Sequence, residues 1–258
     1  MRSDLLRAAI EVEWLKLRRS RVMVSTTVIV LLAPALLAAA FAVAAGQSGT
    51  DPMTLKARAM LPGPGWEGFV SALGQVFGTG GLLGMGIGVA WCFGREYADR
   101  TIVSFYASAT PRGVVAAAKL FLLTLWTLAI AAVLGPAAVL IGMATGLGVP
   151  DTETISALGR VVVMAALTGL LALTVSIFAS VGRGYLVAFG GLIGLIVAAQ
   201  VAVLAGAGAW FPLSSPALWA ADAPAMVPVS VGQLVLVPIV SLAVASATVI
   251  WWQKRPLV

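Results

Sequence analysis

The chain consists of long apolar runs separated by polar or irregular segments, and six runs are long enough to cross a membrane. We expect these six spans at 22–45, 68–93, 120–143, 161–181, 185–207 and 229–252. A helix needs about 20 apolar residues to span the hydrocarbon core, whereas a membrane barrel is built from strands of about ten alternating residues. The pattern therefore predicts an all-α integral membrane protein, with a single transmembrane domain over residues 1–258.

Two segments outside the spans have patterns of their own. Residues 1–21 are predicted to form an amphipathic interfacial helix, and a generic membrane anchor is the alternative. They do not suggest a signal peptide, because the apolar run that follows exceeds the 7–15 residues usual for one. Residues 208–228 are apolar but interrupted by prolines. We expect an outer, re-entrant segment there and not a seventh span.

The connection at 94–119 is much longer and more charged than a simple turn between helices requires. Four of its apolar side chains recur at helical spacing: Ile102, Phe105, Tyr106 and Ala109. Pro111 should end this helix, because the residue before a proline is disfavoured in the helical conformation. The pattern predicts a short amphipathic helix at the membrane surface, between spans two and three. A solvated basic loop is the alternative.

Charge supports one orientation of the six spans. Only 10% of the residues are charged, and 60% are hydrophobic. If both termini are cytoplasmic, 13 basic residues lie inside and 3 outside, which together make up the 16 in the chain. Because cytoplasmic loops of membrane proteins are enriched in Lys and Arg, this bias predicts cytoplasmic termini. It also accounts for the formal net charge of +6, so no nucleic-acid partner is expected.

Two short motifs resemble those of type-2 ATP-binding-cassette export permeases. The first, E-x-x-K-L-R-R-S, begins at Glu13 and precedes the first span; the second, F-x-x-E…T…P-R…A-K, runs from Phe93 to Lys119. The resemblance covers essentially the whole chain and implies a stand-alone, six-span permease subunit in a bacterial cytoplasmic membrane. It also implies two kinds of partner besides the lipid bilayer, namely ATPase subunits and a second permease subunit, identical or not.

The resemblance further implies where the ATPase would act. Two residues would belong to an N-terminal connecting helix: Glu13 and Lys16. Seven residues of the connection between spans two and three would take part in ATPase coupling: Glu96, Asp99, Arg100, Thr101, Phe105, Pro111 and Arg112. Glycine often precedes the threonine in such proteins, whereas Arg100 stands here. The exported substrate is left open.

The chemistry that the sequence lacks narrows the function classes. There is no histidine and only one cysteine, Cys92, and we find no constellation for catalysis, metal or cofactor binding. A P-loop needs a lysine after glycine, and none of the four lysines follows one. We therefore expect the chain not to be an enzyme, and ATP hydrolysis to occur in another subunit.

Polar residues inside the spans are the remaining candidates for function. Three are candidate pathway-lining residues: Gln75, Thr124 and Gln200. Hydrogen bonding between helices is the alternative for each of them. An ion-coupled secondary transporter or channel is the alternative function, but such proteins usually place ionisable groups within their spans. The six predicted spans contain neither Asp nor Glu.

Overall fold

The computed structural model describes residues 2–50, 52–61, 63–99, 110–221 and 228–254. Within these ranges the chain forms helices joined by turns, and no strand occurs in them. The helices are α1 (Arg2–Arg18), α2 (Arg21–Gly46), α3 (Pro52–Met60), α4 (Gly65–Ala98), α6 (Arg112–Ala144), α7 (Thr152–Ala172), α8 (Val175–Val181), α9 (Tyr185–Leu204), α10 (Ser215–Ala221) and α11 (Val231–Lys254).

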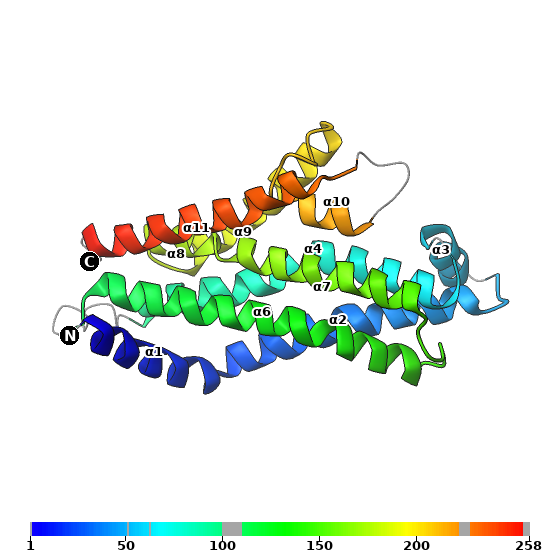
Figure 1. Cartoon of the computed structure of the whole chain (residues 1–258), viewed down its shortest axis with the longest axis horizontal. Helices are drawn as coiled ribbons and strands as arrows, with labels where there is room; N and C mark the ends of the chain where they lie inside the picture. Colours follow the sequence, from blue (N-terminus) through cyan, green and yellow to red (C-terminus); the bar gives the residue numbers. More distant parts are fainter. Residues whose placement is uncertain (1, 51, 62, 100–109, 222–227, 255–258) are drawn as a thin grey trace.

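Six stretches are long and apolar enough to cross a membrane, which confirms the all-helical fold and the predicted number of candidate spans. They are α2, α4, α6, the nearly continuous pair α7–α8, α9 and α11. The start of α1 and the end of α11 lie at one end of the bundle, called here the terminal end (Figure 1). The opposite end, called the distal end, holds α3 and the connection between α6 and α7 (Figure 1).

Two helices are longer than the sequence pattern predicts. The second span was expected at 68–93 and the third at 120–143, but α4 runs over Gly65–Ala98 and α6 over Arg112–Ala144. Residues 94–98 and 112–119, assigned above to the charged connection, are therefore helical. At 1.5 Å per residue, the 34 residues of α4 extend about 51 Å, well beyond the roughly 30 Å of a hydrocarbon core.

The connection between these helices consequently shrinks to residues 99–111. The amphipathic helix expected from Ile102 to Ala109 lies outside the described residues. Three of the proposed coupling residues also fall there: Arg100, Thr101 and Phe105.

Helix α4 is the centre of the bundle and packs against α2, α7, α8 and α9. Its buried side chains recur every four residues along one face: Phe69, Leu73, Phe77, Met85, Val89 and Phe93. This spacing places a continuous apolar stripe against the neighbouring helices. By contrast, α9 and α11 are the least buried of the six candidate spans.

Glycines let the other helices approach α4 closely. A Cβ at Gly86 would lie 2.6 Å from a methyl carbon of Leu192 on α9, and one at Gly88 would lie 2.7 Å from the ring of Trp126 on α6. The Trp126 indole N–H donates to the Thr27 hydroxyl at 2.8 Å, which ties α6 to α2. Gly86 and Gly88 thus act in helix packing, as expected for small residues in membrane helices.

The fourth span is interrupted between Ala172 and Val175, and α8 continues it at the terminal end. Buried hydroxyl groups join α8 to α11: Ser176 Oγ lies 3.0 Å from Thr248 Oγ1, and the Trp252 indole N–H donates to Ser180 Oγ at 2.8 Å. These bonds satisfy polar groups that would be costly to leave unpaired inside the bundle.

Two short helices lie toward the distal end. Helix α3 contacts α2 and was not expected from the apolar pattern. Helix α10 lies within the predicted outer segment 208–228 and packs against α7 and α4 (Figure 1). Whether this segment re-enters a membrane stays a prediction, and its residues 222–227 lie outside the described ranges.

Candidate functional site

Helix α1 buries an acidic residue within an otherwise apolar stripe. Ala9, Glu13 and Leu17 recur at intervals of four and are all buried, with Glu13 only 2% exposed. Val12, one position before Glu13, is by contrast half exposed. The face of α1 that packs on α6 thus contains a buried carboxylate. A buried charge is costly unless it is paired, so this carboxylate needs partners inside the bundle.

The unexpected length of α4 and α6 supplies those partners. Glu96 lies in the last turn of α4 and is 1% exposed, and Lys119 lies two turns into α6 and is fully buried. If either helix stopped at its predicted boundary, these side chains would belong to a solvated connection. Instead, both are held by regular helix beside α1 at the terminal end.

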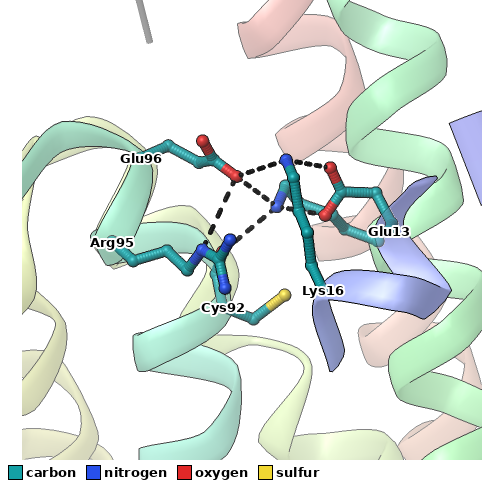
Figure 2. Close-up of polar contacts among 6 residues, drawn as sticks. Glu13, Lys16, Cys92, Arg95 and Glu96 are labelled. Atoms are coloured by element: carbon teal, nitrogen blue, oxygen red, sulfur yellow. Dashed lines mark hydrogen bonds and ion pairs between the residues drawn. The ribbon is translucent and has the colours of Figure 1, made fainter. Parts of the chain in front are cut away.

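Two carboxylates and two ammonium groups alternate in a closed ring, called here the charge ring: Glu13, Lys16, Glu96 and Lys119. Lys16 Nζ lies 2.7 Å from Glu13 Oε1 and 3.2 Å from Glu96 Oε1. Lys119 Nζ lies 2.6 Å from Glu13 Oε2 and 2.8 Å from Glu96 Oε1. Figure 2 shows Glu13 and Glu96 facing each other, with Lys16 between them.

Lys119 is fully satisfied within the ring. Its third short contact is to the backbone carbonyl of Cys92 at 3.3 Å, so all three N–H groups of the ammonium have an acceptor. Arg95 approaches Glu96 at 3.9 Å and lies over the Trp91 ring, 4.7 Å from its centroid. Because buried charges are tolerated only when paired and hydrogen-bonded, the ring binds α1, α4 and α6 to one another.

The structure brings three of the predicted coupling and connecting-helix residues together and leaves others apart. Glu13, Lys16 and Glu96, which are 80 or more residues apart across α1 and α4, meet in the charge ring. Asp99 instead caps the end of α4 and is exposed. Pro111 and Arg112 lie at the start of α6, where the Pro111 carbonyl accepts from Val114 N at 2.9 Å.

Sequence reasoning did not assign Lys119 to the site, although it is the most buried member of the ring. It ends the second quoted motif and stands alone before the apolar run 120–143. A lone lysine at the edge of a span resembles an ordinary membrane-end residue, and only the helical phase of α6 turns it inward. One feature of the sequence could have indicated its role. Lys119 has the opposite charge to Glu13 and Glu96, and all three lie in the two quoted motifs.

A second feature is a cavity of about 1240 Å³ that opens between α4, α7, α9 and α10. Two of the three candidate pathway-lining residues, Gln75 and Gln200, line it from opposite walls, on α4 and α9. Thr124 does not line this cavity; its hydroxyl donates to the Leu120 carbonyl at 2.8 Å within α6. Its lining combines apolar side chains with polar and charged ones, the two kinds of group that ligand sites use for contact area and for orientation.

Comparison with known proteins agrees with this architecture. The family model described as "ABC-2 family transporter protein" matches residues 9–200, which is more than half of the chain and includes every member of the charge ring. No curated protein matches the chain significantly. The six candidate spans are those of a multi-pass membrane protein. The chain therefore belongs to the ABC-2 family of transporter proteins, as a membrane permease component of an ATP-binding-cassette transporter.

Proposed function

We propose that the chain is the permease subunit of an ATP-driven exporter in a bacterial cytoplasmic membrane, coupled to a separate ATPase through the segment between α4 and α6. One observation carries the proposal. The charge ring holds Glu96, three residues before the connection 99–111, and Lys119, eight residues after it, in one buried cluster with α1. A push on this connection would therefore act on three helices at once.

The ring suits the transmission of force better than the binding of a substrate. Three of its four members are nearly inaccessible, since Glu13, Glu96 and Lys119 are each at most 2% exposed, and Lys16 is partly exposed. Their alternating charges also fix the register of α1 against α4 and α6, which is the best-supported role of buried ionic groups. In this proposal Phe105 anchors the ATPase, and Arg112 and the exposed Asp99 give the contact its specificity.

The direction of the chain in the membrane follows from charge. The terminal end holds α1 and the basic residues that precede α2, and we place it in the cytoplasm by the positive-inside rule. The ATPase would then dock on the same side as 99–111. None of the four lysines in these 258 residues follows glycine, which supports hydrolysis in a partner.

A second permease subunit is proposed to pack on α9. This helix is the least buried candidate span, and a Cβ at Gly190 or Gly194 would meet nothing within 4 Å. A G-x-x-x-G pair on an uncovered helix suits close helix contact in lipid. Gln75 and Gln200 would line the route of the substrate, because both face the cavity beside α9.

The first test is co-purification from native membranes. A tagged chain should recover an ATPase subunit and, in a homodimer, a second copy carrying another tag. Phe105→Ala should weaken the ATPase association about tenfold, because loss of an anchoring aromatic costs about 2 kcal/mol or more. Arg112→Glu should weaken it as well. Glu96→Gln keeps the shape of the buried side chain and is expected to preserve association while lowering transport per ATP hydrolysed.

Lys56→Ser is the matched control, because Lys56 is an exposed basic residue on α3 at the distal end. It should leave both association and coupling unchanged. Recovery of no ATPase, together with transport driven by an ion gradient alone, would favour the secondary-transporter alternative. Normal ATPase association in Phe105→Ala and Arg112→Glu would reduce 99–111 to a solvated loop.

A further inference from the structure

The distal cavity is lined by regularly spaced helix positions. One stripe of each of three helices lines it, with positions recurring every three or four residues. On α4 the stripe runs from Glu67 to Leu82, which is roughly 22 Å of helix. The cavity thus descends from the distal end to about the middle of the bundle.

The lining changes in character with depth. Glu67 and Glu153 lie at the distal rim, in the first turns of α4 and α7. Gln75 and Gln200 lie farther in, and the deep part of the lining holds the apolar residues Leu82, Val161 and Ile196, with Arg160 beside Val161. A ligand that matches this order has an apolar body to fill the deep half and a polar group held near the rim.

The charge at the rim selects the sign of that polar group. Three carboxylates line the cavity there, from Glu67, Asp151 and Glu153. Asp151 accepts from Thr154 N at 2.8 Å, and this backbone hydrogen bond holds the pKa of its carboxyl below the usual value, so it is ionised at neutral pH. Arg160 lies two turns deeper on α7, where it disfavours a second positive charge.

We propose that this cavity binds a cationic amphiphile, with its apolar body between α4, α7 and α9 and its positive headgroup at the carboxylate rim. The assignment rests on the proposed function only in treating the ligand as the exported substrate. Binding itself is independent of any ATPase. The substrate class would then be lipophilic amines and quaternary ammonium compounds.

The test uses a single reactive cysteine in the cavity. Thr79 is exposed and lies on the α4 stripe, three turns deeper than Glu67, whereas the native Cys92 is buried and should not react. Thr79→Cys in phosphatidylcholine nanodiscs should react with N-ethylmaleimide. Dodecyltrimethylammonium at about ten times its Kd should slow this reaction about tenfold, because labelling competes with occupancy. Dodecyl sulfate, which has the same chain and a negative headgroup, should not.

Two further variants make the result decisive. Gln200→Cys probes the opposite wall and should show the same protection, while Leu55→Cys, exposed on α3 outside the cavity, should show none. Adding Glu67→Gln and Glu153→Gln should abolish most of the preference for the cationic amphiphile. Equal protection by both amphiphiles, no protection, or no reaction at either cavity cysteine would each overturn the proposal. None of these outcomes bears on ATPase association, which is measured separately.

Discussion

At the scale of single residues, the charge ring is the arrangement in the described part of the chain with the largest desolvation cost, because it holds four charged groups together, three of them buried. Taking an ion out of water costs several kcal/mol, and only partners within hydrogen-bonding distance offset it. Lys119 has three acceptors and no exposure, so it depends entirely on the two carboxylates and the Cys92 carbonyl. Each carboxylate in turn is shared between two lysines.

Lys119→Met should therefore be strongly destabilising, by about 3–5 kcal/mol, since it leaves buried carboxylates poorly compensated. The measurement is unfolding in SDS titration, followed by circular dichroism. The double variant Lys119→Met/Glu13→Gln should recover part of the loss, because the excess charge is removed. As a control, Arg7→Ala breaks a pair whose side chains are 83% and 65% exposed, and exposed pairs contribute at most about 1 kcal/mol. A Lys119 effect no larger than that of Arg7 would contradict the importance of the ring.

At the scale of elements, α4 combines two functions along one helix. The glycine-rich middle of α4 allows α6 and α9 to pack closely against it. The last turn of α4 contains Glu96, which belongs to the charge ring. Since α4 is continuous from Gly65 to Ala98, the cavity stripe and the ring are connected by one rigid body. A tilt of α4 would therefore change both ends together.

Gly88→Ala tests the close approach of α4 and α6. The new methyl group would lie 2.7 Å from the Trp126 ring, which cannot move freely because its N–H is bonded to Thr27. We expect a loss of about 1–3 kcal/mol from overpacking, seen as a lower thermal unfolding midpoint in detergent. Gly80→Ala, on the same helix with nothing within 4 Å, should be neutral or slightly stabilising. Equal behaviour of the two variants would show that the contact can relax.

At the scale of the whole molecule, the even number of spans places the start of α1 and the end of α11 at one end (Figure 1). The ring lies at that end, and the cavity opens toward the other, distal end. With the orientation proposed above, the proposed coupling segment would lie on the cytoplasmic side, and the proposed binding cavity would open on the opposite side. ATP hydrolysis at the terminal end and substrate binding at the distal end would then be coupled only through the long helices.

Labelling of introduced cysteines checks this orientation. A membrane-impermeant maleimide should label Lys56→Cys and Val149→Cys in sealed cells, and Asp4→Cys and Lys254→Cys only after permeabilisation. All four positions are exposed, and the native Cys92 is buried, so background reaction should be low. Labelling of Lys254→Cys in sealed cells would reverse the orientation and place the proposed coupling segment outside.

The sequence by itself determined the fold class, the number of spans and the family resemblance, because these depend on features that survive without coordinates. Membrane helices must be apolar for about 20 residues, so the six runs are visible directly. The match over residues 9–200 bears out the resemblance drawn from two short motifs. Gln75 and Gln200 were candidates because an amide within an apolar span stands out. Both line the cavity and Thr124 does not, a difference that nothing in the pattern indicated, and their role in a pathway stays a prediction.

Only the tertiary structure decided where the spans end and which charges are buried. Hydropathy falls at the first charged residue, so the pattern stopped the second span at 93 and began the third at 120, and it placed Glu96 and Lys119 in the charged connection between them. A charged residue can continue a helix inside the bundle when residues of opposite charge lie beside it. The partners from α1 are 80 residues away from Glu96 and more than 100 from Lys119 along the chain. Long-range pairing of this kind leaves no local periodicity, which is why the ring, unlike the spans, could not be predicted from the sequence.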